Sequence, residues 1–439
     1  MPPFVLIGLI AVLLWSLISH RFERWGIAGP AMLLVLGAAA TVWNLDAFGV
    51  SLDSPVTEKV VEVVLSVLLF ADATEVRGGI FGGEGKVTAR LVLIALPLSL
   101  LLTAILCGWL VPESFAVIGV IACVIMPTDF APATRLLRSR LLPERVRAIL
   151  NVESGYNDGL VSPIFGMALP IAVIIEPLVR EYLRTGKDTF TLDEQDVGHN
   201  GEKFVEAFLN AVPATLVAIV IGVALGGLVG LAMRAARDRG VADAGGARFV
   251  MVLLPLIAYG IATIPALEAN GFVAAFVAGL IYRVARTGGM AERVIPHEEL
   301  LLVEEVGTLT ANFVWFMLGG ATLLVFTVSF DVRIVLLALL ALTLLRLGPV
   351  YLSLMGSSVP RGDRVRIGLL GPRGTATIVF GLLAYNALPD DAGDLVLTAM
   401  VTTVVGSILL HGVLAPLVLR RLAPEGDDAA KARVPSPGH

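Results

Sequence analysis

The chain has 439 residues, of which 56% are apolar and only 16% are charged, and its mean hydropathy is +0.86. A soluble domain usually carries about 25% charged residues, and a water-soluble fold of this size could not bury so much apolar surface. This composition excludes disordered, fibrous and disulfide-stabilised proteins, and it predicts an all-α polytopic membrane protein. The net charge is −5, and no nucleic-acid partner is expected.

Thirteen apolar stretches, bounded by charged residues or by Pro and Gly clusters, are candidates for membrane spans of about 20 residues. In chain order they are 4–19, 25–43, 55–73, 88–111, 114–138, 146–176, 204–233, 248–265, 268–284, 305–327, 332–355, 365–388 and 393–419. No basic residue precedes Arg21, so the first stretch is interpreted as a retained span. We expect 1–421 to form a single membrane transport domain and 422–439 to be a disordered cytoplasmic tail.

The basic residues divide unequally between alternate loops. With thirteen spans, 24 of the 32 lysines and arginines fall in one set of loops and 6 in the other. The positive-inside rule assigns the arginine-rich set to the cytoplasm, so we expect the N-terminus outside the cell membrane and the C-terminus in the cytoplasm. The other two, Arg346 and Arg373, lie inside spans, where an unpaired charge costs at least about 2.5–3.5 kcal/mol, and both therefore need partners.

Acidic residues inside the spans are the counterpart of these arginines. Asp72 lies at the end of the third span, and Asp129 lies in the fifth, between two prolines that interrupt it. In the sixth span, Ser154 and Asp158 are four residues apart and share one helix face. Glu153 and Asn157 share the adjacent face, so this helix directs two acidic and polar pairs towards the bundle interior.

Two of the spans are interrupted at matching positions. Pro127 and Pro132 break the fifth span, and the segment Gly368–Thr377 interrupts the twelfth. Such breaks are tolerated at membrane depth where the freed backbone groups line a cavity or meet protein partners. Since the two spans are seven apart, spans one to six and eight to thirteen are expected to be inverted repeats. Matching broken helices in inverted repeats indicate an ion site of a secondary transporter.

Five motifs together resemble one family. They are Pro127-Thr-Asp129, Glu153-Ser-Gly-Tyr-Asn-Asp158, the stripe Gly271–Gly279, Arg346 shortly before Pro349, and Gly371-Pro-Arg-Gly374. Their order and spacing, over about residues 60–415, are similar to those of the monovalent cation:proton antiporters, which include the NhaP exchangers and the animal sodium/hydrogen exchangers. The resemblance implies a homodimer with crossed, discontinuous fifth and twelfth helices, a dimerisation domain and a moving core domain.

The resemblance also implies roles for single residues. Asp158 matches the aspartate that binds the ion and carries the proton, and Asn157 the asparagine before it. Ser154 and the Thr128 backbone match oxygen ligands of the transported Na⁺, and Asp129 matches the acid of the crossover. As an alternative from the residues alone, Asp129 is a helix cap.

Three further residues complete this set. Glu153 matches a structural glutamate that pairs with an arginine, here Arg346, and Arg373 matches the arginine beside the second crossover, where it could instead neutralise helix ends. Archaeal members have a glutamate near the end of the third span, where this chain has Asp72 one residue off, so Asp72 is a candidate for that role. His411 is interpreted as an ordinary buried residue of the last span.

The predicted function is secondary active transport that exchanges Na⁺, or Li⁺, for H⁺ in pH homeostasis, with no enzymatic activity and no cofactor. A buried carboxylate can hold a proton or a cation, and competition at Asp158 during alternating access gives exchange. Since Asn157 cannot titrate and Glu153 is expected to pair with Arg346, the exchange should be electroneutral. The oxygen ligands accommodate K⁺ equally, so a K⁺/H⁺ or mixed-cation antiporter is the alternative. A channel or ion sensor is the alternative from another class, disfavoured by the short tail.

Overall fold

The computed structural model describes most of the chain, and all regular secondary structure in the described residues is helical. The described ranges are 3–25, 28–52, 54–75, 83–111, 113–133, 142–185, 194–289, 294–328 and 330–415. The predicted tail 422–439 and the end of the predicted fifth span lie outside them.

The helices follow the predicted apolar stretches. Those of the first part are α1 (Pro3–Trp25), α2 (Gly29–Thr41), α3 (Leu45–Leu52), α4 (Pro55–Glu75), α5 (Gly85–Arg90), η1 (Leu91–Ala95), α6 (Leu96–Leu110), α7 (Phe115–Ile125), η2 (Ala131–Ala133) and α9 (Glu144–Thr185). Those of the second part are α10 (Glu194–Asp238), α11 (Ala244–Ala262), α12 (Gly271–Thr287), α13 (His297–Val328), α14 (Val332–Leu342), α15 (Leu344–Ser353), α16 (Arg361–Leu369), α17 (Thr375–Ala387), α18 (Asp390–Ser407) and η4 (Ile408–Leu414).

By length and composition, eight helical stretches of the described chain could cross a membrane, or nine if α2 and α3, which meet at 119°, form one span. The chain is thus a multi-pass membrane protein, while the number of thirteen spans and the inverted repeats stay predictions. Two shorter apolar helices, α7 and α17, belong to the spans predicted to be interrupted. Between the predicted sixth and seventh spans, the chain is helical up to Thr185 and again from Glu194.

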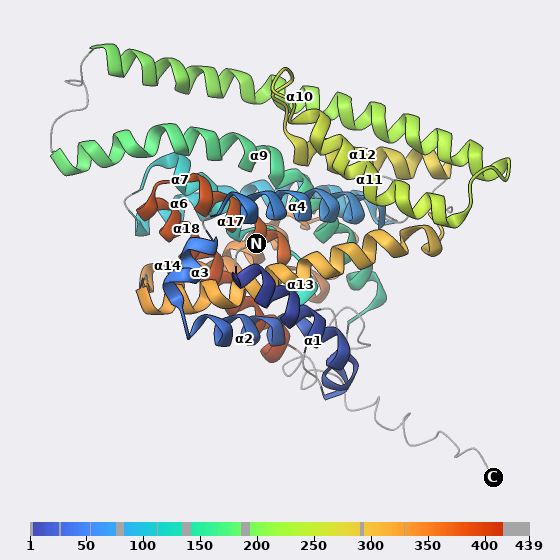
Figure 1. Ribbon diagram of the computed structural model, residues 1–439, viewed down its shortest axis with the longest axis horizontal. Helices are drawn as coiled ribbons and strands as arrows, with labels where there is room; N and C mark the ends of the chain where they lie inside the picture. Colours follow the sequence, from blue (N-terminus) through green and yellow to red (C-terminus); the bar gives the residue numbers. More distant parts are fainter. Residues whose placement is uncertain are drawn as a thin grey trace, which may run out of the picture.

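Two long helices mark one edge of the bundle. Figure 1 shows α9 and α10 side by side along this edge, with α1 and α2 on the opposite side. α10 packs along α12, and α12 in turn packs against α4. The predicted Gly271–Gly279 stripe lies at these contacts, because a Cβ at Gly279 would press on the backbone of Phe70 in α4. Glycine therefore permits the close approach of α12 and α4.

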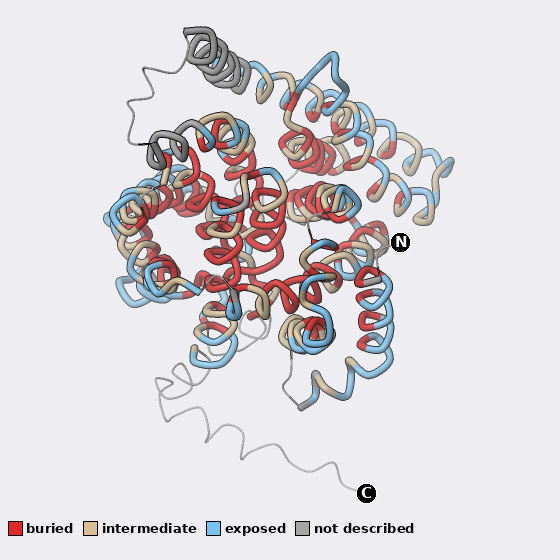
Figure 2. The backbone as a smooth tube through the Cα atoms, turned by 60° about the vertical axis from the view of Figure 1, so that its left-hand side comes forward, coloured by how far each residue is buried: buried red, intermediate tan, exposed pale blue. Residues whose placement is uncertain are grey.

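The two short helices form the centre of the bundle. Figure 2 shows that the buried residues gather in the middle of the fold. In α17, every residue from Thr375 to Ala384 is buried, and α7 is buried along most of its length. A helix that is apolar on all sides belongs in the interior, so these two helices bring their broken ends to the middle of the protein.

Three helical spans are broken near this centre. α7 ends at Ile125, just before Pro127, and the chain then has no regular secondary structure until the short turn η2. α16 ends at Leu369 and α17 begins at Thr375, with Pro372 and two glycines between them. The predicted interruptions are therefore present. A third break, at Thr343 between α14 and α15, was not predicted.

Candidate functional site

The first two breaks meet at Asp129. Its backbone N–H donates to the carbonyl of Pro372 at 2.9 Å. Its carboxylate accepts from the N–H of Ala131 at 2.8 Å and from the N–H of Thr375, the first residue of α17, at 2.6 Å. A carboxylate is favourable at a helix N-terminus. Gly374 leaves room for it, since a Cβ there would collide with the Asp129 carboxylate. Asp129 therefore caps α17 and joins the two breaks.

Arg373 binds backbone carbonyls at the C-terminal ends of two broken helices, α7 and α14. Its side chain is completely buried, and its Nε donates to the carbonyl of Ile125, the last residue of α7, at 2.7 Å. Nη2 donates to the carbonyl of Ala341 at 3.3 Å, near the break of α14, and Nη1 to the carbonyl of Gly371. A cation is favourable at helix C-termini. The arginine thus neutralises the carbonyl ends, which is the alternative that the sequence left open.

The point where the two breaks meet is called the crossing below. The polar turn of α9, residues 153–158, lies beside it. Ser154 Oγ donates to the Thr128 carbonyl at 2.8 Å, and Asn157 Nδ2 donates to the Thr128 hydroxyl. Asn157 Nδ2 also reaches Glu153 Oε1 at 3.3 Å. The first break is therefore held against α9 through Thr128, and Ser154, Asn157 and Thr128 form one hydrogen-bonded group.

Asp158, the residue after Asn157 in α9, is buried beside this group. It is 5% exposed, and its enclosed Oδ1 has no hydrogen-bond partner among the described residues. The enclosed Oδ1 of Asn157 also lacks one. Asp72, Asp129 and Arg373 lie close enough to act electrostatically on Asp158. Most buried polar groups are hydrogen-bonded, so an enclosed carboxylate oxygen without a donor marks a place for a proton or a cation.

Glu153 and Arg346 form a buried bidentate ion pair. Both Nη1–Oε1 and Nη2–Oε2 are 2.9 Å apart, and the two side chains are 5% exposed or less. Arg346 lies in α15, just after the break at Thr343, and Nη2 also lies 3.4 Å from the carbonyl of Ile367 in α16. The pair thus ties α9 to α15 and α16, and it leaves neither charge free.

Asp72 lies at the edge of this group. It is half-buried near the end of α4, and its backbone carbonyl faces Gly155 of α9, where a Cβ would be only 3.4 Å away. The structure therefore gathers all of the candidate residues around one turn of α9. This holds for Asp72, Thr128, Asp129, Glu153, Ser154, Asn157, Asp158, Arg346 and Arg373.

On the side facing α12, α9 is lined by small residues. Gly159 faces the ring of Phe276, and Tyr156 meets the same ring edge-on at 5.9 Å between centroids. Further along, Asn270 caps α12 through Phe272 N, and its Nδ2 donates to the carbonyl of Ser162 at 3.4 Å. The turn that carries Asp158 is therefore covered by an aromatic contact with α12.

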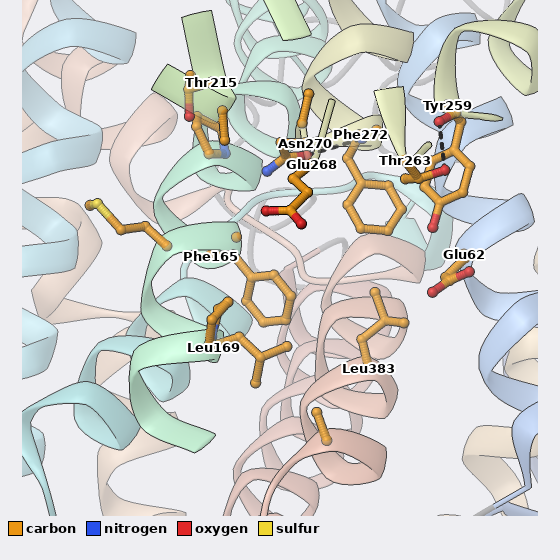
Figure 3. Close-up of a pocket in the computed structure, with 18 of the residues that line it drawn as sticks. Glu62, Phe165, Leu169, Thr215, Tyr259, Thr263, Glu268, Asn270, Phe272 and Leu383 are labelled. Carbon is orange, nitrogen blue, oxygen red and sulfur yellow. Dashed lines mark hydrogen bonds between the residues drawn. The ribbon is translucent and has the colours of Figure 1, made fainter. Parts of the chain in front are cut away.

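Beyond this contact lies a pocket of about 300 Å³ that was not predicted (Figure 3). It is bounded by α4, α9, α10, α11, α12 and α17, and three carboxylates line it, those of Glu58, Glu62 and Glu268. Glu62 is paired with Lys59 at 2.8 Å. Pro163 lines the pocket and follows Asp158 by only five residues of α9. Phe276 and Gly159 lie on the same stretch of the α9–α12 interface.

The polar turn of α9 brings oxygen donors of several kinds together. Within the described ranges there is no cluster of three or more His, Cys, Asp or Glu side chains arranged to hold a metal ion. Instead, the turn offers one unpaired carboxylate beside hydroxyl, carbonyl and amide oxygens, from Asp158, Ser154, Thr128 and Asn157. Oxygen donors of these kinds are the ligands that hard cations prefer.

Sequence reasoning missed Ser407 at the crossing, and it interpreted His411 as an ordinary buried residue without a place there. Ser407 Oγ accepts from the backbone N–H of Arg373 at 2.7 Å, and His411 lies four residues further on, against the same break. The available signal was a serine and a histidine at helical spacing inside the last apolar stretch.

Comparisons with known proteins agree with this architecture. A family model described as "Sodium/hydrogen exchanger, transmembrane" matches residues 8–421. The fold is similar to a structure of the sodium proton antiporter MjNhaP1 from Methanocaldococcus jannaschii at pH 8, with a TM-score of 0.71 and 18% identity over 95% of this chain and 97% of that chain. An electron-microscopy structure of the same antiporter matches with a TM-score of 0.65 and 19% identity, over 95% and 96% of the two chains.

Proposed function

Since the chain belongs to the transmembrane sodium/hydrogen exchanger family, we propose that it exchanges a monovalent cation, with Na⁺ as the expected ion, for H⁺ across the cell membrane. The observation that carries the proposal is the enclosed Asp158 carboxylate beside two broken helices, with an oxygen that receives no hydrogen bond. A bare buried anion is costly, so Asp158 is occupied by a proton or by a cation at each stage of transport.

The charges at the crossing favour exchange of one cation for one proton. Four acidic residues, Asp72, Asp129, Glu153 and Asp158, and two basic residues, Arg346 and Arg373, lie around this turn. Asp72 is half-buried at its edge. Glu153 is bound by Arg346, and each oxygen of Asp129 accepts a backbone N–H. Asp158 is then the group that cycles, and the transport cycle is electroneutral.

Movement of the site follows from the packing around α9. The Asp158 turn is anchored to the segment after α7 by hydrogen bonds and to α15 by an ion pair. Towards α12, Gly159 of the same turn meets the ring of Phe276. We propose that α9 and the broken helices move as a core domain against a dimerisation domain, in a homodimer within the lipid bilayer. The arginine-rich loops support an external N-terminus and a cytoplasmic C-terminus.

The test is transport by the purified protein in liposomes containing a pH-sensitive dye. A Na⁺ gradient should drive H⁺ movement in the opposite direction, and parallel runs with Li⁺ and K⁺ identify the preferred cation. Asp158→Asn should abolish exchange, because it removes the titrating ligand while keeping the shape of the side chain. Asp238→Asn, at an exposed aspartate at the end of α10, is the matched control and should retain exchange. Near-normal exchange by Asp158→Asn would contradict the site.

A further inference from the structure

The break between α16 and α17 frees backbone groups that need partners, since carbonyl and N–H groups at helix ends have none within the helix. Most of these partners have been described: Arg346, Asp129 and the guanidinium of Arg373. Two further freed groups are the carbonyl of Leu369 at the end of α16 and the N–H of Arg373 just before α17. Both face the last helix of the described chain.

Two buried side chains of this helix satisfy them. His411 Nε2 lies 3.0 Å from the Leu369 carbonyl, and Ser407 Oγ accepts from the Arg373 N–H at 2.7 Å. His411 Nδ1 lies 3.4 Å from Ser407 Oγ. Both residues are 1% exposed or less. One neutral tautomer fits all three contacts: Nε2–H donates to Leu369, and Nδ1 accepts the Ser407 hydroxyl proton.

The local helix geometry supports a special role for this segment. Directly after Ser407, α18 widens into the π-helical turn η4 (Ile408–Leu414), and such turns occur frequently at functional sites. The same turn also touches the first break, because a Cβ on Gly412 would lie 3.4 Å from the carbonyl of Pro132. Residues of α18 and η4 therefore contact both broken segments at once.

We infer that Ser407 and His411 are positioning residues of the ion site, which fix the 369–373 segment so that Arg373 and Asp129 hold the helix ends around Asp158. Ser407 holds the Arg373 backbone, whose side chain binds the end of α7. Two residues later, the Thr375 N–H donates to Asp129. Asp129 directly follows Thr128, whose carbonyl accepts from Ser154 of α9. Neither residue touches the transported ion. This inference rests on the proposed function.

The test compares His411→Leu, His411→Gln and Ser407→Ala with the wild-type protein in the liposome assay with Na⁺. His411→Leu cannot donate to Leu369, so the apparent KM for Na⁺ should rise about tenfold and the maximal rate should fall. His411→Gln keeps an N–H donor and should recover most of the wild-type KM. Ser407→Ala should resemble His411→Leu. His297→Leu, on the exposed start of α13, is the control and should leave both parameters unchanged.

The melting temperature in detergent separates positioning from mere packing. A packing role would lower the melting temperature of His411→Leu and of His411→Gln while leaving the KM of the folded protein unchanged. A KM within twofold of wild type for His411→Leu and Ser407→Ala would overturn the inference even though the antiporter works. If wild-type protein moves no protons with Na⁺, Li⁺ or K⁺, the proposed function fails instead, and the inference with it.

Discussion

The ring of Phe276 lies directly against the Cα of Gly159, one residue after Asp158 in α9. Phe276 follows Phe272, which lines the pocket, by one turn of α12. A side chain at position 159 would have no space, because its Cβ would overlap the ring.

Gly159→Ala should therefore slow exchange and lower the melting temperature, since overpacking costs about 1–3 kcal/mol. Combining it with Phe276→Leu, which removes the ring, should recover part of both losses. Gly260→Ala is the matched control, because no atom lies within 4 Å of a Cβ at that position of α11. If Gly159→Ala behaves like Gly260→Ala, the two helices are not in close contact here.

The buried Glu153–Arg346 pair gives a prediction about stability. Arg346→Ala leaves the glutamate charge buried without its partner, which should cost about 3–5 kcal/mol of stability. Glu153→Gln should cost less, because the amide oxygen can still accept from the arginine. The measurement is the melting temperature in detergent of both single variants and the double variant. Strictly additive losses would show that the two side chains do not interact.

Arg373→Lys tests the binding of the carbonyl ends. The guanidinium reaches carbonyls of Ile125, Ala341 and Gly371 together, and an ammonium group lacks the planar fork that makes this possible. Each carbonyl left unpaired should cost about 1–3 kcal/mol, so stability and exchange should both fall. Arg366→Lys, at a half-exposed side chain of α16, should change neither. Equal behaviour of the two variants would contradict the capping role.

If exchange is electroneutral, the membrane potential should have no effect on the rate of Na⁺-driven proton movement. With the membrane potential of the liposomes clamped by potassium and valinomycin, the Na⁺-driven rate should be the same at zero and at negative potential. A marked change would mean that a second proton moves. Asp129→Asn and Asp72→Asn would then identify its carrier, since these are the other acids near Asp158.

The sequence allowed the positions of the breaks to be predicted, because their causes are local. Pro127 and Pro372 lack the N–H of a helical hydrogen bond, and Pro372 also lies between two glycines, Gly371 and Gly374. Proline alone does not end a helix, since α9 continues through Pro163. The polar turn of α9 was equally evident, since Ser154 and Asp158 share a face by spacing alone. Its nearness to Asp72, Asp129, Arg346 and Arg373 rested on the resemblance to a family, because spacing within one helix cannot identify partners on others.

Features that depend on distant packing were not predictable. The break at Thr343 has no proline or glycine at that position, and its freed Ala341 carbonyl is bound by Arg373, 32 positions later. The role of Ser407 depends on a backbone group at another helix end. The pocket is formed by side chains from six helices, and each of those helices has an ordinary apolar sequence.

The crossing of the two breaks has a consequence for how the protein is made. Asp129 meets Thr375 across 246 positions of sequence, and Arg373 meets Ile125 across 248. During synthesis, α7 is complete long before the ribosome reaches the residues that cap its end. Contacts between such distant segments form late in folding. The ion site is therefore assembled only when the last helices have entered the membrane, and an unfinished chain cannot yet transport ions.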